Sequence, residues 1–274
     1  MSLFITSLNS GSNGNCYYLG NSDEAVLVDV GISCKEVEKR MERLGLSLNT
    51  LKAIFISHEH SDHIKGLEVL SKKYALPVYI TGPTLQNSRL DLNHHLVKNF
   101  NGYESILIGN LIIKAFQKRH DAADPYSFTI EGAGVKVGVL TDIGSVCEQV
   151  IQNFKQCHAV FLEANYDDVM LDEGNYPYYL KTRIRSEKGH LSNSQALDLF
   201  RNHRSESLHH VILSHLSKDN NCPIVVKDLF EKHAAQTKVT VASRFHETEV
   251  FNITANGVVE NLMKSNLAFQ TSLF

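Results

Sequence analysis

The sequence contains no tryptophan, only five prolines and only five cysteines in 274 residues. No two cysteines form a C-x-x-C pair; they stand at Cys16, Cys34, Cys147, Cys157 and Cys222. An odd number of scattered cysteines argues against a disulfide framework and favours reduced thiols in a cytoplasmic protein. Because the chain also lacks repeats, low-complexity segments and Pro- or Gly-rich linkers, we predict a single domain that spans residues 1–274.

Long apolar runs and an excess of basic charge are also missing. No stretch approaches the roughly 20 continuous apolar residues of a membrane helix, so we expect no membrane partner. The first residues lack the basic and apolar regions of a signal peptide. The formal net charge of −3 gives no general attraction to nucleic acid, so binding of that kind requires a local basic patch.

Strand-like and helix-like segments alternate along the chain. Short apolar runs predict strands at 3–8, 16–19, 25–30, 53–56, 135–140, 159–162, 211–213, 239–242 and 250–253, with a hairpin turn at 131–134. Ser33 and Glu36 form the S-x-x-E pattern of a capping box and predict a helix that stops at Gly45. Helical spacing predicts further helices at 64–74, 146–154, 194–200 and 225–234. Interleaved strands and helices predict a layered α/β fold.

Four of the predicted strands lead into a side chain that can bind a metal or a proton. In open α/β folds, functional sites collect outside the carboxyl ends of the strands. The four side chains belong to His58, Asp142, Glu163 and His215.

The segment I-S-H-E-H-S-D-H holds the densest chemistry of the chain. In an extended segment His58 and His60 project to the same side, so both imidazoles can reach one metal. A helix that begins after Ser61 turns Asp62 and His63 toward a second position. Imidazole suits zinc, iron and nickel, and the carboxylate widens the choice toward manganese. The alternative is a polar turn ahead of an amphipathic helix, but three histidines and one aspartate in six residues favour a metal centre.

His58, His60, Asp62 and His63 match the H-x-H-x-D-H signature of the metallo-β-lactamase superfamily, which the chain resembles. The resemblance implies an αββα four-layer sandwich, in which two sheets are flanked by helices, and a centre with two divalent metal ions. It also implies that His58 and His60 serve one metal, while Asp62 and His63 serve the other. Zinc is the default metal for this histidine-rich set, and manganese is the alternative.

The resemblance assigns roles to four more residues. Asp29, in V-D-V-G, matches an aspartate that supports the site from behind the ligands. His120, in Q-K-R-H-D-A, matches the third ligand of the first metal. Asp142, in L-T-D-I-G, matches a carboxylate that bridges both metals, and His215, in L-S-H-L-S, matches the last ligand of the second.

Each of these assignments has an alternative interpretation. Asp29 fits a turn residue equally well, and Asp142 fits the N-cap of the helix that follows it. A lone histidine such as His120 is usually not a ligand. Two rivals to His215 stand at the start of the same predicted strand, away from the predicted site: His209 and His210.

Within the superfamily, the chain looks most like the YycJ-like branch, also called WalJ or VicX. The segments that carry this likeness are G-S-N-G-N-C-Y-Y, H-D-A, T-D-I-G, L-E-A-N-Y-D, G-H-L-S-N and L-S-H-L-S-K-D-N-N. The resemblance implies phosphodiester substrates and metal-dependent 5′-to-3′ DNA exonuclease activity.

Transfer-RNA-processing members of the superfamily suggest a role for His190, in G-H-L-S-N. By that likeness His190 serves the leaving group and Glu163 orients it. A helix-cap histidine and a buried salt-bridge glutamate are the alternative. A local basic stretch can contact phosphates, although such a run is usually only a solvated face. The stretch contains Lys181, Arg183, Arg185 and Lys188.

The predicted function is two-metal hydrolysis, in which metals about 3.5–4 Å apart hold a bridging hydroxide. Asp62 and Asp142 orient that hydroxide for attack on phosphorus, and the expected partner is nucleic acid, DNA in particular. Two alternatives remain: a hydrolase of small esters or thioesters, and a metal-binding regulatory protein without turnover. The sequence leaves undecided the native metal, the oligomeric state and the role of residues 239–274.

Overall fold

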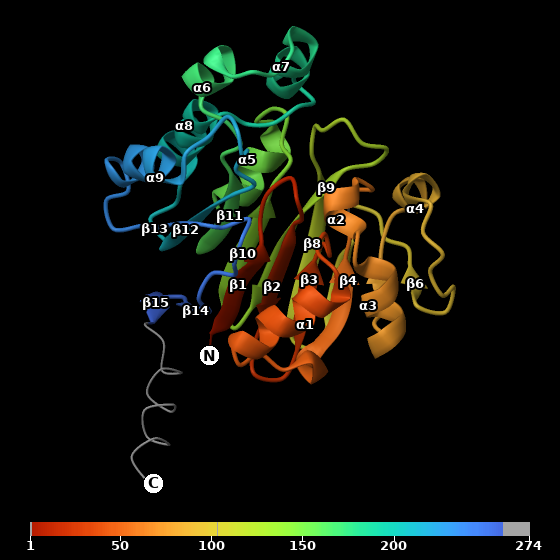
Figure 1. The fold of residues 1–274 in the computed structure, drawn as a ribbon. Coiled ribbons are helices and arrows are strands. Elements are labelled where there is room, and N and C mark those ends of the chain that lie inside the picture. Colours follow the sequence, from red (N-terminus) through yellow and green to blue (C-terminus); the bar gives the residue numbers. More distant parts are fainter. Residues whose placement is uncertain (1, 103, 260–274) are drawn as a thin grey trace, which may run out of the picture.

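The computed structural model describes residues 2–102 and 104–259, in which two β-sheets pack face to face and helices cover both outer sides (Figure 1). This is the αββα sandwich that the family resemblance implies, and it confirms the layered α/β fold that the sequence pattern predicts. The first sheet holds eight strands, in the spatial order β15 (Gly257–Val259), β14 (Phe251–Thr254), β1 (Leu3–Asn9), β2 (Cys16–Gly20), β3 (Ala25–Val28), β4 (Leu51–Phe55), β5 (Val78–Tyr79) and β6 (Val97–Lys98). The second holds seven, in the order β13 (Lys238–Val241), β12 (His210–Ser214), β11 (Ala159–Glu163), β10 (Val135–Leu140), β9 (Tyr126–Gly132), β8 (Leu111–Gln117) and β7 (Ser105–Ile108).

The helices divide between the two outer faces. The chain that builds the first sheet also forms α1 (Cys34–Arg43), the 3-10 turn η1 (Leu48–Thr50), α2 (Ser61–Ile64), α3 (Leu67–Tyr74) and α4 (Gly82–Ser88). The chain that builds the second sheet forms α5 (Glu148–Phe154), α6 (Asp168–Glu173), α7 (Tyr178–Arg185), α8 (Asn193–His203) and α9 (Pro223–Glu231).

Three apolar layers hold the sandwich together. Between the sheets, the rings of Tyr17 and Phe161 lie 4.9 Å apart, so side chains of β2 and β11 meet in the central layer. An outer layer packs α1 and α3 against the first sheet. The other outer layer packs α5, α8 and α9 against the second, with the rings of Phe200 and Phe230 5.4 Å apart. Each sheet therefore buries both faces, which explains why its central strands are almost wholly apolar.

The predicted helix at 64–74 is divided into α2 and α3, which corrects the sequence-based boundary. The break lies at Gly66, whose N–H donates to the Val30 carbonyl at 2.8 Å instead of continuing the helix. A Cβ atom at Gly66 would lie 2.0 Å from the Ile32 carbonyl oxygen, so only glycine allows this close approach. The break lets α2 turn as a separate short element directly after the histidine-rich segment.

The capping box at α1 is half formed. The Ser33 hydroxyl accepts from the Glu36 N–H at 3.3 Å, as predicted, but the Glu36 carboxylate pairs with Lys39 at 3.4 Å. The helix ends at Arg43 and is followed by Gly45 at φ 68°. The hairpin predicted at 131–134 joins β9 and β10, which pair antiparallel.

No helix within the described residues has the length and apolar character that crossing a bilayer requires. Residues 260–274, the last part of the C-terminal segment for which the sequence suggests no function, lie outside the described residues.

Candidate metal centre

The predicted site residues converge where parallel strands end. Strands β3 and β4 run parallel in the first sheet, and β10, β11 and β12 run parallel in the second. Three residues just past these strands occupy the left-handed backbone region: Asp29 at φ 62°, Asp142 at φ 54° and His215 at φ 57°. Such a conformation costs on the order of 1–3 kcal/mol per non-glycine residue and is concentrated at functional sites.

Three imidazoles gather on one side of the centre. His58 and His60 come from the loop between β4 and α2, and His120 follows β8. The Nε2 atom of His58 lies 3.0 Å from Nδ1 of His60, and the ring centroids of His58 and His120 are 4.9 Å apart. One ligand atom from each of the three lies within 4.8 Å of the others. The alternation expected of an extended segment thus brings His58 and His60 to the same side.

A second group gathers on the other side. Asp62 and His63 lie in α2, and Oδ2 of Asp62 is 3.6 Å from Nε2 of both His63 and His215. Asp142 stands between the two groups. Its Oδ2 lies 3.3 Å from Nε2 of His63, and its Oδ1 lies 3.9 Å from Nε2 of His120.

The alternative role of Asp142 as a helix N-cap is wrong, because α5 begins at Glu148 with Cys147 as its N-cap. Instead, Oδ2 of Asp142 is buried without a hydrogen-bond partner, and so are the Nε2 atoms of His120 and His215. A buried polar atom without a partner costs about 1–3 kcal/mol. Imidazole and carboxylate donors suit divalent transition metals. These residues therefore fit a centre for divalent metal ions, which would supply the missing partners.

Asp29 lies behind the ligands, where its carboxylate contacts Ser57 and His63. Its Oδ1 accepts from the Ser57 N–H at 2.8 Å, and its Oδ2 lies 2.7 Å from Nδ1 of His63. The Ser57 hydroxyl lies 2.8 Å from Oδ2 of Asp29 and 2.8 Å from Nδ1 of His58. Because Nδ1 of His63 is occupied in this way, its Nε2 is the nitrogen that faces the centre. The backbone of Asp29 thus has a turn conformation, and its side chain contacts a ligand candidate, as the predicted supporting role requires.

Two polar residues near the loop between β1 and β2 also reach the centre, and the sequence analysis gives them no role. The Asn15 amide donates to Oδ2 of Asp62 at 3.2 Å and lies 3.1 Å from Nε2 of His63. The Ser10 hydroxyl accepts from the backbone N–H of His215 at 2.7 Å. The segment G-S-N-G-N-C-Y-Y carries part of the family resemblance, but its pattern does not indicate which side chain faces the metals.

Glu163, at the end of β11, connects His190 and His215. Its Oε1 lies 2.8 Å from Nδ1 of His190 and 3.0 Å from Nδ1 of His215. Its Oε2 accepts from the backbone N–H groups of Ile143 at 2.6 Å and Leu191 at 3.2 Å. Burial alone would raise the pKa of Glu163, but the charge and hydrogen bond of His190 and the hydrogen bond of His215 lower it to about 2. Glu163 is thus a buried, ionised carboxylate.

Burial and charge act differently on the imidazoles of the metal-free centre. Burial lowers the pKa of His58 well below its ordinary value and so favours the neutral ring, the form that binds a metal. Burial acts in the same direction on His63 and His215, but the surrounding carboxylates outweigh it. With Asp142 as the largest contributor, they raise the pKa of His63 well above its usual range and the pKa of His215 to about 10. A metal ion that binds these two must displace their protons.

Comparison with known proteins identifies the family. The model of the β-lactamase superfamily domain matches residues 24–219. Exodeoxyribonuclease YycJ from Bacillus anthracis is 35% identical over 229 residues, which cover 81% of this chain and 85% of that protein. Exodeoxyribonuclease WalJ from Streptococcus pneumoniae is 31% identical over 260 residues, which cover 92% of this chain and 96% of that protein. The chain belongs to the β-lactamase superfamily.

Solved structures of the superfamily fold agree with the architecture. The metallo-β-lactamase fold protein YhfI from Bacillus subtilis superposes with a TM-score of 0.70 at 16% identity, over 92% of this chain and 100% of that one. Zn²⁺-bound PqqB from Methylobacterium extorquens superposes with a TM-score of 0.69 at 14% identity, over 90% and 99%. Superfamily membership and the clustered ligand atoms together identify a metal-dependent hydrolase whose cofactors are divalent metal ions.

The basic stretch ahead of His190 lies beside this superfamily site, but three of its four cations already have partners. Arg183 lies on α7, and its Nε donates to Oδ2 of Asp121 at 2.6 Å. Arg185 pairs with Asp172 at 2.6 Å. Two further cations belong to the stretch. Lys181 is half-buried, and its Nζ donates to the Asp172 carbonyl at 2.7 Å, whereas Lys188 is exposed. Arg183 and His190 line a cleft of about 260 Å³ at the edge of the centre.

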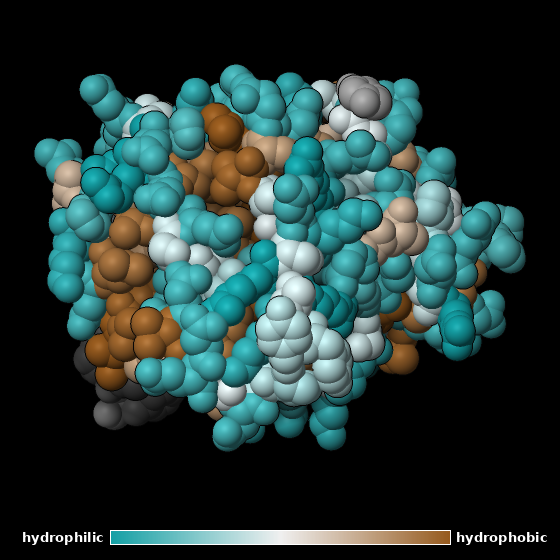
Figure 2. All heavy atoms as spheres, turned by 90° about the horizontal axis from the view of Figure 1, so that it is seen from above, coloured by the Kyte–Doolittle hydropathy of each residue, from teal (hydrophilic) through white to brown (hydrophobic). Residues whose placement is uncertain are grey.

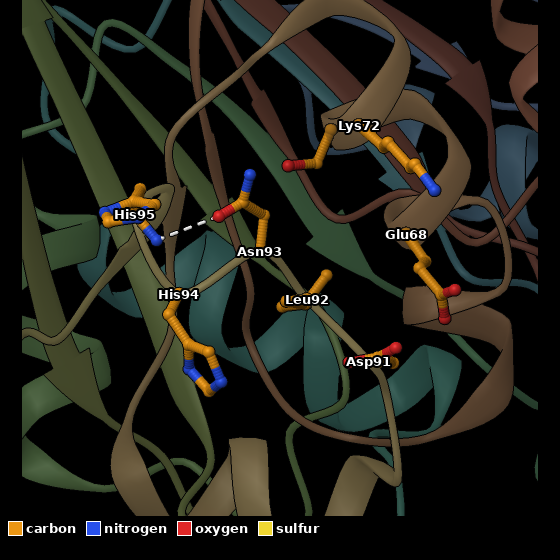
Figure 3. A pocket seen from close by; sticks show the side chains of 8 residues that line it. Glu68, Lys72, Asp91, Leu92, Asn93, His94 and His95 are labelled. Carbon is orange, nitrogen blue, oxygen red and sulfur yellow. Dashed lines mark hydrogen bonds between the residues drawn. The ribbon is translucent and has the colours of Figure 1, made fainter.

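Two other histidines line a separate pocket and do not form a second metal centre. The pocket, of about 380 Å³, lies between α3 and residues 91–95 (Figure 3). The rings of His94 and His95 point in different directions and away from the carboxylates of Glu68 and Asp91. Within the described residues, all groups of ligand atoms close enough to hold a metal belong to the superfamily site.

Proposed function

We propose that this superfamily member is a DNA exonuclease that hydrolyses phosphodiester bonds at a two-metal centre with 5′-to-3′ polarity. The names of its relatives in Bacillus anthracis and Streptococcus pneumoniae support an exodeoxyribonuclease, because each match covers most of both chains. The observation that carries the two-metal part is the position of Asp142, whose carboxylate lies within 4 Å of ligand nitrogens from both groups.

In this proposal His58, His60 and His120 hold one ion, while Asp62, His63 and His215 hold the other. Asp142 reaches both. Two bound divalent ions supply an activated water and offset the charge that develops on the phosphoryl oxygens. The carboxylates of Asp62 and Asp142 accept hydrogen bonds from the attacking water and so set its direction.

His190 is the proposed proton donor to the leaving oxygen. Because Nδ1 of His190 is bonded to Glu163, its Nε2 is the nitrogen available to the substrate. The Glu163 carboxylate fixes the orientation of the His190 ring, and the side chain of His190 is 22% exposed, so it can reach a bound strand. Glu163 acts as a positioning residue because it touches His190 and not the reacting phosphate.

Zinc is the metal that we propose for this histidine-rich set, with manganese as the alternative. All five cysteines are free thiols, which suits the reducing cytoplasm that we propose as the location. Arg183, Arg185 and Lys188 are the proposed phosphate contacts of the strand that enters the cleft beside His190.

End-labelled single- and double-stranded DNA, with matched RNA, provides the test. Purified protein is reloaded with zinc or manganese and compared with its His60→Ala variant. We expect label to be released from the 5′ end of DNA and not by the variant. Hydrolysis of RNA alone, or release from the 3′ end, would contradict the substrate and the polarity. Hydrolysis of small esters without cleavage of any strand would favour the small-ester alternative.

A further inference from the structure

A groove of about 440 Å³ adjoins the metal centre, and the function proposed above makes no use of it. It meets the cleft that contains His190 at Ser217, which lines both. At the same end, Ser10 lines the groove and accepts the backbone N–H of His215. The wall away from the centre belongs to the loop between β13 and β14. We call this the Phe245 groove; its walls include Ser10, Leu216, Ser217, Lys218, Arg244 and Phe245.

Exposed apolar surface gathers near this groove. Figure 2 views the molecule from the side at which the site strands end, and its apolar side chains collect on the left of the view. The middle and right of the same view are mainly hydrophilic. Large exposed apolar residues in this region are Ile224 and Val225 of α9, and Phe245, which lines the groove together with Pro223. An apolar patch beside a catalytic centre is typical of a binding surface.

Phe245 presents its ring to solvent from a fixed backbone. The residue is 74% exposed. Arg40, a buried residue of α1, donates to the Phe245 carbonyl at 3.1 Å and to the Leu8 carbonyl at 2.7 Å. The Asn13 amide donates to the carbonyl of Arg244 at 2.8 Å. These bonds tie the loop to the first strand and its neighbours, so the ring loses little conformational freedom when it binds a partner.

The groove is lined by two cationic side chains, Lys218 and Arg244, and neither forms an ion pair within the described residues. Nη1 of Arg244 is buried without a hydrogen-bond partner, and Lys218 is exposed. Two acidic residues stand close to them in the sequence, and the charge of one of these is offset by an arginine. Glu247 forms an ion pair with Arg43 at 2.7 Å, whereas Asp219 accepts a hydrogen bond from the Tyr176 hydroxyl at 3.1 Å. The groove therefore differs from the basic stretch on α7, whose arginines are both paired with carboxylates.

We propose that the Phe245 groove binds the unpaired nucleotides of a single strand whose end lies in the metal centre. The Phe245 ring stacks on a base, and Arg244 and Lys218 contact phosphates. Proteins that hold single strands combine such a cationic groove with an exposed aromatic face, because every base has a π-face to stack. The inference rests on the proposed function, since it assigns the path of the same substrate.

The occupant is a strand and not a second copy of this chain. An apolar protein surface would cover Ile224 and Val225, but it would leave the unpartnered guanidinium of Arg244 unsatisfied. It would also obstruct the approach to His190, which the groove adjoins through Ser217. A base-paired duplex does not fit either, because its bases are stacked on one another and cannot stack on Phe245.

Fluorescence anisotropy tests the proposal with a labelled, short phosphorothioate oligothymidylate and the full metal-loaded chain. Phe245→Leu keeps the apolar bulk and removes the ring, so we expect about tenfold weaker binding. Phe245→Trp keeps an aromatic face and should bind as the wild type does. Arg244→Gln and Lys218→Gln should each reduce the slope of log K against log salt by about one. Leu107→Ala, at an exposed position on β7 outside the groove, is the matched control and should bind as the wild type does.

Hydrolysis of bis(p-nitrophenyl) phosphate, which is too small to reach the groove, separates the two proposals. We expect it to be unchanged in Phe245→Leu. Equal oligonucleotide binding by Phe245→Leu and wild type would overturn the groove, and so would equal losses in Leu107→Ala. A change of molecular mass in Phe245→Leu without a change in oligonucleotide affinity would also overturn it, since it would indicate a second copy. If binding depends on Phe245 but no phosphodiester is hydrolysed, the groove stands and the proposed function fails.

Discussion

The metal centre and the basic stretch on α7 lie side by side, yet they are built in opposite ways. Most of the ligand residues are buried, and the outward nitrogens of several are held by a neighbour, such as Nδ1 of His63 by Asp29 and Nδ1 of His120 by the Gly189 carbonyl. The two arginines of α7 are exposed and paired with carboxylates, such as Asp121 for Arg183. In both clusters several ionisable residues stand close together in the sequence. Only in the first do side-chain atoms without a protein partner point toward a common centre that a metal ion can occupy.

This difference shows that a cluster of ionisable residues has a different meaning in the buried core and on the exposed surface. A buried polar atom must find a partner, so three unpartnered buried atoms in one place indicate a missing ligand. An exposed cation has no such need, because water or a nearby carboxylate satisfies it at little cost. The density of charge in a sequence therefore predicts function well in the core and poorly on the surface. The following predictions, from the largest effect to the smallest, test that contrast.

Removal of a metal ligand should have the largest effect. His60→Ala and Asp142→Ala should each lower hydrolysis of the DNA strand by on the order of 10³-fold or more, because charge stabilisation at the phosphate is lost. The measurement is the initial rate with metal content determined on the same sample. Near-normal activity in either variant, with the expected metal content, would contradict the proposed roles.

His190→Ala should lower kcat by about 10²–10⁴-fold, as expected for the loss of a general acid, and should leave the metal content unchanged. A fall in metal content would instead make His190 a ligand, since its ligand atom lies within 4.8 Å of those of Asp142, Glu163 and His215. Glu163→Gln is the companion variant. It should lower kcat with little change in KM, because the imidazole of His190 loses the carboxylate that orients it.

Asp29→Ala should weaken metal affinity by about 10–100-fold, as is typical when a residue behind a ligand is removed. Its carboxylate holds both His63 and Ser57, so the effect should appear in competition with a chelator before it appears in the rate at saturating metal. Thr248→Ala, in a buried hydroxyl pair with Thr6 away from the ligands, is the control and should leave the metal affinity unchanged.

Metal affinity should fall as pH is lowered through the neutral range. The surrounding carboxylates raise the pKa of His215 to about 10 in the metal-free protein. Protonation of His215 therefore stabilises the metal-free fold fully below the unfolded pKa of about 6.5, and this contribution is lost as pH rises through about 10. A metal ion competes with that proton and must release it. Calorimetric titrations in buffers of different ionisation enthalpy should show proton release at pH 7. An enthalpy that is independent of the buffer would contradict the account.

The smallest effects should come from the basic stretch. Arg183→Ala should weaken strand binding only a few-fold, because its guanidinium is paired with Asp121. Asp121→Asn should strengthen binding, since it releases that guanidinium toward the phosphates. Equal and large losses for Arg183→Ala and His60→Ala would erase the distinction between the buried and the exposed cluster.

Local patterns were sufficient for the fold and for the ligand cluster. The spacing in I-S-H-E-H-S-D-H determines which side chains point together, because side chains alternate along an extended segment and α2 begins directly after it. Helix α7 was not predicted, since Y-Y-L-K-T-R-I-R carries little apolar periodicity and buries none of its residues. The single-domain assignment for residues 1–274 stays a prediction, as do the individual roles of the site residues.

Contacts between distant parts of the chain were beyond the sequence analysis. The hydrogen bond that fixes the Phe245 loop joins Arg40 to a residue 205 positions away. The amide of Asn15 reaches Asp62 across 47 positions. Nothing in the local pattern of either segment predicts its partner, because both contacts depend on how the strands of the first sheet are ordered. The C-terminal segment, which suggested no function as a sequence, thus provides one wall of the proposed groove.

Anomalous diffraction from a crystal of the metal-loaded protein would test the central claim most directly. We expect two peaks, both beside Asp142. One should lie within coordination distance of His58, His60 and His120, and the other within coordination distance of Asp62, His63 and His215. A single peak, or a peak held by Glu163 and His190, would contradict the two-metal centre proposed for this protein.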